Sequence, residues 1–106
     1  MRMMMKVSIP VEPGNAAIAN GTLGSTMAGI LNELKPEAAY FVAENGVRTG
    51  YLFLNMTENS QLPALAEPFF LAFNAAVSVT PAMSAQDLAA AGPGIAHSVK
   101  TYNPAK

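Results

Sequence analysis

Two strongly apolar segments joined by Asn45-Gly46 constrain the fold more than any other feature of this sequence. Asn-Gly favours the two positive-φ positions of a type I′ turn, so residues 38–56 are predicted to form a β-hairpin. A two-residue loop places Tyr40 opposite Tyr51. Both faces of this hairpin are largely apolar, whereas a half-exposed antiparallel sheet alternates apolar with polar side chains. We therefore expect the sheet to be covered on both faces.

Two further strands are predicted, one before the hairpin and one after it. Residues 3–11 alternate with a period of two, and Pro10 should end that strand or make its edge irregular. Residues 75–80 alternate in the same way and are closed by Pro81. The sequence therefore predicts four strands.

Helices are expected between these strands. Asn15 should cap a helix that Pro36 stops, because the apolar residues between them recur at helical spacing. A second helix should begin near Asn59 or Ser60. Pro68 must kink or split this second helix, since a proline nitrogen cannot donate the helical hydrogen bond.

The C-terminal residues predict a helical extension. Ser84 and Asp87 have the spacing of a capping box, which starts a third helix. After the Gly-Pro-Gly break at residues 92–94, Ile95 and Val99 resume a one-sided apolar stripe, so a short helix should follow.

The predicted order is β-α-β-β-α-β followed by this extension. That order indicates an α+β, ferredoxin-like domain spanning residues 1–106, with both crossover helices on one face of the sheet. The other face must then be covered by the C-terminal helix, by a ligand or by another copy of the chain.

Charge is scarce in this sequence. Charged residues make up 12% of the chain, about half the usual share, so a small domain should hide part of its surface in an oligomer. The net charge is −1 and the basic residues are scattered, so neither a nucleic-acid nor a membrane partner is expected. Gly50-Tyr-Leu-Phe-Leu54 resembles an RNA-binding RNP1 pattern only faintly, because the flanking basic residue is missing.

Several kinds of chemistry are excluded or unexpected. The chain has no cysteine, which excludes disulfides, thiolate metal sites and cysteine nucleophiles. The acidic residues show no metal-ligand spacing, so we expect no metal and no cofactor. No signal peptide is recognisable and no run reaches the ~18 apolar residues that span a bilayer, so we expect cytoplasmic residence.

The order of elements and one run of residues resemble a known group. The run begins at Glu67-Pro-Phe-Phe, continues through Asn74-Ala-Ala-Val-Ser-Val-Thr-Pro-Ala-Met83 and ends in the capped helix at Ser84. It is similar to uncharacterised small bacterial proteins of the dimeric α/β-barrel superfamily. In that superfamily two ferredoxin-like sheets face each other across a two-fold axis and enclose a cavity, and members include monooxygenases without bound metal, isomerases and peroxidases. The resemblance implies a homodimeric barrel and transfers no catalytic residue.

One sheet face is a candidate ligand site. If the aliphatic residues of the strands meet the helices, hydroxyl groups and one amine gather on the opposite face, where a few polar groups in an apolar cavity would suit a small-molecule site. A partly buried ammonium at Lys6 would need a partner or a shifted pKa, and it could orient an anionic ligand. The proposed ligand-binding residues are Lys6, Ser8, Tyr40, Thr49, Tyr51, Ser78 and Thr80.

Two interpretations of this face remain open. In the first, the protein binds a small apolar or oxygenated molecule between the sheets of a homodimer, with or without catalysis. In the second, the hydroxyls hydrogen-bond across a filled dimer core, Lys6 extends to solvent, and the protein serves in interaction. His97 is interpreted as a helix-surface residue, and Glu67 is either a general base aimed by Pro68 or a solvated carboxylate.

Overall fold

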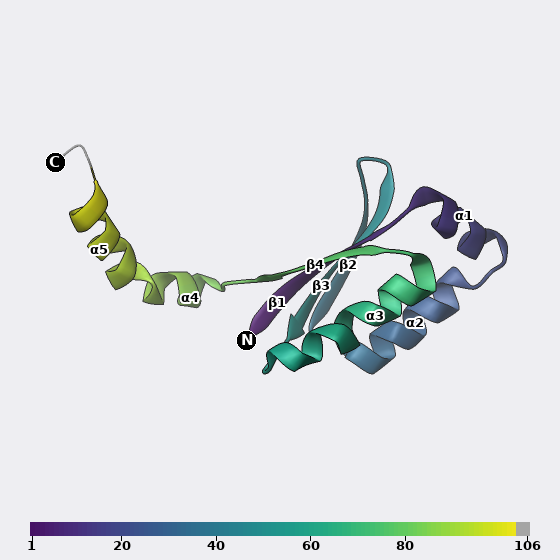
Figure 1. Ribbon diagram of the computed structural model, residues 1–106, viewed down its shortest axis with the longest axis horizontal. Helices are drawn as coiled ribbons and strands as arrows, with labels where there is room; N and C mark the ends of the chain where they lie inside the picture. The colour runs from purple at the N-terminus through teal and green to yellow at the C-terminus, as the bar shows by residue number, and fades with distance from the viewer. Residues whose placement is uncertain (104–106) are drawn as a thin grey trace.

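Four strands form one antiparallel sheet in the computed structural model, which describes residues 1–103 (Figure 1). The order across the sheet is β2-β3-β1-β4, and every neighbouring pair is antiparallel. This α+β arrangement is compatible with the predicted ferredoxin-like topology. The strands are β1 (Arg2–Ile9), β2 (Ala38–Glu44), β3 (Val47–Asn55) and β4 (Ala76–Pro81).

The predicted hairpin is confirmed. Strands β2 and β3 are joined by Asn45 and Gly46, whose φ angles are 53° and 76°. These positive angles are the ones a two-residue type I′ turn requires. Tyr40 lies opposite Tyr51, so the predicted assignment of side chains to the two faces also holds.

Five α-helices and one short 3-10 helix accompany the sheet within residues 1–103. Three α-helices lie between the strands and two follow the last strand (Figure 1). None of the helices in this part of the chain combines the length and apolar character that crossing a bilayer requires. The helical elements are α1 (Val11–Ala19), α2 (Leu23–Leu34), η1 (Asn59–Gln61), α3 (Leu62–Phe73), α4 (Ala85–Ala90) and α5 (Gly92–Tyr102).

The prediction that Asn15 caps the first helix is wrong. Helix α1 begins at Val11, directly after Pro10, and runs through Pro13 and Gly14. A proline is tolerated in a first turn, where its missing N–H has no intrahelical acceptor. Gly14 is buried, and a Cβ there would lie 2.7 Å from Nη1 of Arg48, so the glycine allows a close approach to β3.

Of the two outcomes predicted at Pro68, a kink or a split, the structure excludes the split. Helix α3 runs unbroken from Leu62 to Phe73 with Pro68 inside it. The capping box at Ser84 is confirmed, because Asp87 N–H donates to Ser84 Oγ at 3.1 Å and Ser84 N–H donates to Asp87 Oδ2 at 2.9 Å. These hydrogen bonds hold the pKa of the Asp87 carboxyl below its usual value.

The hydrophobic core lies between one face of the sheet and helices α1, α2 and α3. Met5, Val7, Leu52 and Phe69 are its largest fully buried side chains. Burial of side chains of this size stabilises the fold by about 1.5–3 kcal/mol each. This helix-covered face is therefore where most of the stabilising burial takes place.

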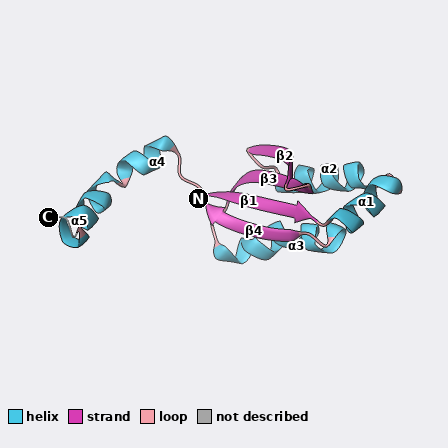
Figure 2. Ribbon diagram, turned by 90° about the horizontal axis from the view of Figure 1, so that it is seen from above, coloured by secondary structure: helices cyan, strands magenta, loops and turns pink. Residues whose placement is uncertain are grey.

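No described helix covers the opposite face of the sheet, which we call the open face (Figures 1 and 2). Residues 83–102, the C-terminal arm, lead away from the sheet instead, and neither α4 nor α5 has a buried residue. The molecule is 62 Å long, with a radius of gyration of 18.0 Å, against about 13 Å for a compact chain of this length. The chain's own C-terminal helices therefore do not provide the second cover.

Candidate functional site

The open face carries all seven residues that the sequence singled out. Strand register places four of them side by side across the sheet, in the order Tyr40, Tyr51, Lys6 and Ser78. The remaining three lie on the neighbouring rows, where Ser8 pairs with Thr49, and Thr80 pairs with Met4.

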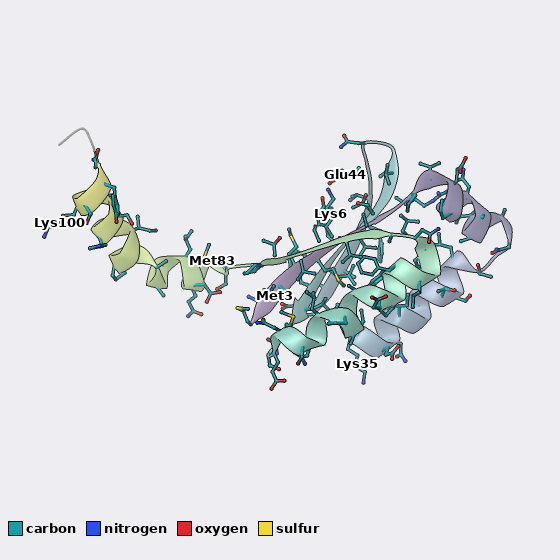
Figure 3. All side chains as sticks on the ribbon, in the orientation of Figure 1. Met3, Lys6, Lys35, Glu44, Met83 and Lys100 are labelled. Carbon is teal, nitrogen blue, oxygen red and sulfur yellow. The ribbon has the colours of Figure 1, made fainter. Side chains whose placement is uncertain are left out.

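Lys6, Glu44 and Tyr51 form a polar cluster at the centre of this face. The Lys6 ammonium makes an ion pair with the Glu44 carboxylate, and the Tyr51 hydroxyl donates to the same carboxylate. Figure 3 shows Lys6 and Glu44 together beside the β2–β3 hairpin. The predicted need of Lys6 for a partner is thus met by a residue that sequence reasoning did not select.

These contacts shift three pKa values in a consistent way. The hydrogen bond from Lys6, then that from Tyr51, lowers the pKa of the Glu44 carboxyl. The hydrogen bond to Glu44 raises the pKa of the Lys6 ammonium and, separately, that of the Tyr51 hydroxyl. At neutral pH the cluster therefore holds one positive and one negative charge, and an anionic ligand would compete with Glu44 for Lys6.

The other open-face residues differ in their accessibility. Tyr40 is 64% exposed, and Ser78 and Thr80 are exposed as well. Thr49 is 2% exposed, and its hydroxyl donates to the Val47 carbonyl at 3.0 Å. Thr49 is therefore engaged within its own strand, while the hydroxyls of β2 and β4 are accessible.

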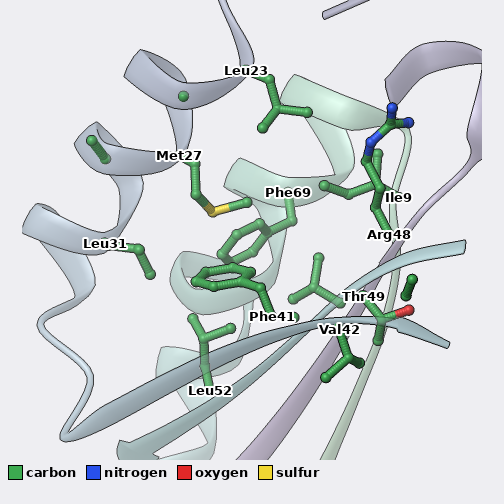
Figure 4. Close-up of a pocket in the computed structure, with 15 residues that line it drawn as sticks. Ile9, Leu23, Met27, Leu31, Phe41, Val42, Arg48, Thr49, Leu52 and Phe69 are labelled. Carbon is green, nitrogen blue, oxygen red and sulfur yellow. The ribbon is translucent and has the colours of Figure 1, made fainter. Parts of the chain in front are cut away.

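A second candidate site lies on the helix-covered side of the sheet. An apolar pocket of about 560 Å³ opens between α2 and the β2–β3 hairpin (Figure 4). Arg48 and Thr49 are the polar residues of its lining, and strand register places the Thr49 side chain on the open face. The lining residues are Val7, Ile9, Leu23, Gly24, Met27, Ala28, Leu31, Phe41, Val42, Ala43, Arg48, Thr49, Gly50, Leu52 and Phe69.

Small residues create this pocket. Gly24 and Ala28 leave the neighbouring flank of α2 without bulky side chains, and an added Cβ at Gly24 would meet nothing within 4 Å. Across the pocket, Phe41 lies over Gly50, where an added Cβ would be 3.1 Å from the ring. The ring of Phe41 is 54% exposed, so it forms part of the pocket's mouth.

Arg48 lies at one end of this pocket. Figure 4 shows its side chain beside Ile9, with the guanidinium directed away from the aromatic rings. Nη1 donates to Asn15 Oδ1 at 3.1 Å, and no carboxylate is recorded as an ion-pair partner of this guanidinium among the described residues. The pocket therefore combines an apolar interior with one cation at its rim.

A third hollow, of about 700 Å³, lies where the C-terminal arm leaves the sheet. In its lining, Arg2 Nε is 2.5 Å from Glu37 Oε1, and Asp87 caps its own helix. Lys35 also lines this hollow and makes no ion pair with any described residue. This hollow therefore has a more highly charged lining than the apolar pocket, whose lining includes Arg48 alone among charged residues.

The remaining candidate residues stand apart from these sites. His97 lies on α5 and Glu67 on α3, and both are exposed. Glu67 borders a shallow groove between α3 and β4 rather than the pocket or the open face. No cluster of three metal-binding side chains occurs in the part of the chain that the structure describes.

Fold and site together define an α+β protein with a four-stranded antiparallel sheet, an apolar pocket between α2 and the hairpin, and an open sheet face. A scan against models of protein families found no match for this chain, and a search of curated proteins found none either.

Proposed function

We propose that this protein binds a small, largely apolar molecule and does so as a homodimer. The pocket between α2 and the hairpin carries the first part of this proposal. Its volume of about 560 Å³ falls within the roughly 300–1,000 Å³ of small-molecule sites, and its lining is apolar with a few polar groups. Arg48 at the rim suits an oxygenated or anionic group at one end of the ligand.

The open sheet face supports the second part. Tyr40 and Val42 are 64% and 47% exposed on a face that also bears Met4 and Phe53. In the proposed dimer two such faces meet, as in the dimeric α/β-barrel superfamily that the sequence resembles. The strand order β2-β3-β1-β4 is compatible with the ferredoxin-like sheet that this assembly requires.

The space between two facing sheets is a second candidate location for the ligand. Lys6, Tyr40, Tyr51, Ser78 and Thr80 would line it, with Ser8 and Thr49 on the next row. The pocket is the stronger candidate, because one chain alone forms it, whereas Lys6 is already paired with Glu44.

The ligand proposal is tested with an apolar sulfonate dye, 1-anilinonaphthalene-8-sulfonate, and two matched variants of α2. Gly24→Leu fills the pocket, whereas Gly29→Leu adds the same side chain to the same helix outside it, and a Cβ added at either glycine would meet no other side chain within 4 Å. We expect Gly24→Leu to weaken dye binding at least tenfold and Gly29→Leu to leave it within twofold. Equal affinities in both variants would rule out the pocket as the site.

The competing interpretation is a non-catalytic dimer whose sheets meet in a filled core. A second question is whether a ligand lies in the pocket or between the two sheets, and Lys6→Met distinguishes these locations. The substitution removes the only ammonium of the open face among the described residues but leaves the pocket intact. If the dye binds at the pocket, its affinity stays unchanged in Lys6→Met. A large loss would move the ligand to the space between the sheets.

A further inference from the structure

The C-terminal arm has an apolar stripe that none of the described residues 1–103 covers. Leu88 on α4 and Ile95, Val99 and Tyr102 on α5 are between 52% and 76% exposed. The last three recur at helical spacing, so they share one face of α5. An exposed stripe of this kind marks an interaction surface.

The arm leaves the sheet in a defined direction. Ala82 N–H donates to the Arg2 carbonyl at 3.0 Å, which extends the pairing of β4 beyond its last residue. The capping box between Ser84 and Asp87 then fixes the start of α4. Both views show the arm projecting beyond the end of the sheet rather than folding back over it (Figures 1 and 2).

The exposed area is larger than a single folded chain of this size requires. The chain exposes 7002 Å², whereas a compact protein of 11.1 kDa exposes about 5,700 Å². The excess of about 1,300 Å² is greater than the roughly 800 Å² that each partner buries in a standard interface. The extended conformation thus leaves enough surface for a stable dimer.

The open face offers a complementary surface. Tyr40 and Val42 of β2 are its largest strongly exposed side chains, and the charge of Lys6 beside them is balanced by Glu44. Helix α5, which carries three residues of the stripe, spans about 16 Å, roughly half the 30 Å or so of the nine-residue strand β3. The stripe is therefore short enough to lie within the open face, and it matches that face in apolar character.

We propose that two copies of this chain exchange their C-terminal arms. The stripe of one arm packs on Tyr40 and Val42 at the β2 side of the partner's open face, while the remaining strands of the two open faces meet across the two-fold axis. This inference rests on the homodimer of the proposed function. It identifies the partner's C-terminal arm as the segment that, together with the partner's sheet, covers each open face.

Site-directed crosslinking tests the exchange, because the chain has no native cysteine. Val42→Cys and Val99→Cys are combined in one full-length chain and treated with a short bismaleimide. We expect a crosslinked dimer on a denaturing gel, with a yield at least fivefold above that of a control carrying Thr101→Cys in place of Val99→Cys. Thr101 lies on the same helix, away from the stripe.

Each other outcome is informative. A crosslink within one chain would show that the arm folds back onto its own sheet and would overturn the exchange. A dimer in solution without a Val42–Val99 crosslink would overturn the exchange and leave the proposed dimer standing. A monomer in solution would overturn both the exchange and the proposed dimer. The dye-binding experiment would still test the pocket, because one chain alone forms it.

A charge on the stripe supplies an independent measurement. Val99→Asp should raise the dimer dissociation constant at least tenfold, because packing on the partner would bury the new carboxylate. Thr101→Asp should change it less than twofold. Since both residues are exposed in the single chain, neither variant should impair folding. Equal dissociation constants for the two variants would contradict the exchange.

Discussion

The two faces of the sheet are built from the same strands but are treated differently by the rest of the chain. On the helix-covered face, Met5 and Leu52 are completely buried beneath α2 and α3. On the open face, Tyr40 is 64% exposed and Val42 is 47% exposed. Within residues 1–103 the chain supplies helices for one face only, although both faces carry apolar side chains.

The two faces therefore contribute to different processes, the helix-covered face to folding and the open face to the proposed assembly. Burial on the helix-covered face stabilises each chain by itself, whereas in the proposed homodimer burial on the open face requires a second copy. Substitutions on the two faces should therefore differ in whether their effects depend on protein concentration.

The largest expected effect is that of removing the α3 ring that packs against the helix-covered face. Phe69→Ala should lower the free energy of unfolding by about 3–5 kcal/mol, because Phe69 is completely buried and its loss leaves a cavity. Tyr40→Ala should instead lower the urea concentration at the midpoint of unfolding, and the size of this decrease should grow as protein concentration rises. Urea unfolding at several concentrations measures both, and a concentration-independent Tyr40→Ala effect would contradict the distinction.

The hairpin turn sets which residues reach the open face, and its geometry should be costly to change. Gly46→Ala should destabilise the protein by about 1–2 kcal/mol, because φ at this residue is 76° and a Cβ opposes that conformation. Gly29→Ala should be stabilising by about 0.5–1 kcal/mol, since Gly29 is helical and has open space around it. Thermal unfolding of the two variants is the measurement, and a destabilising Gly29→Ala would show that α2 is packed differently.

The smallest expected effect concerns the Lys6–Glu44 pair. The pKa of Glu44 is lowered in the fold, so its contribution is present above the ordinary glutamate pKa of about 4.3 and is lost as pH falls through the folded value. The pKa of Lys6 is raised, so its contribution is present below the ordinary lysine pKa of about 10.4 and is lost as pH rises through the folded value.

Thermal unfolding of Lys6→Met across this pH range tests the pair. The acid-side loss of stability should become shallower than in the native chain, because Glu44 no longer gains from a neighbouring ammonium on folding. Arg2 and Glu37 form the comparable exposed pair at the other end of the sheet, and Arg2→Met should likewise make the acid-side loss shallower, because the hydrogen bond from Arg2 lowers the pKa of Glu37. If the stability of Lys6→Met falls with decreasing pH as steeply as that of the native chain, the pair contributes nothing to stability.

The sequence was most informative where local chemistry alone decides structure. Asn45-Gly46 determines the turn, period-two alternation assigns Tyr40 and Lys6 to one face, and the spacing of Ser84 and Asp87 starts α4. Each of these features depends on residues close together in the chain or in the same strand pairing.

Features that depend on packing between distant elements could not be predicted. The pocket arises because Gly24 of α2 faces the hairpin, a juxtaposition that only tertiary structure creates. Glu44 reaches Lys6 although strand register places it two rows away, because long side chains bridge that distance on a twisted sheet. The start of α1 could not be predicted either. In the sequence Pro13-Gly14 is typical of a turn, whereas in the fold Gly14 lies in a helix packed against Arg48.

Native mass spectrometry of the freshly purified full-length chain tests the central claim most directly. That claim is that a second copy covers the open face. We expect a dimer of twice the 11.1 kDa chain mass at micromolar concentration, and a larger monomer fraction when Val99→Asp is introduced. A native chain that stays monomeric under these conditions would contradict it.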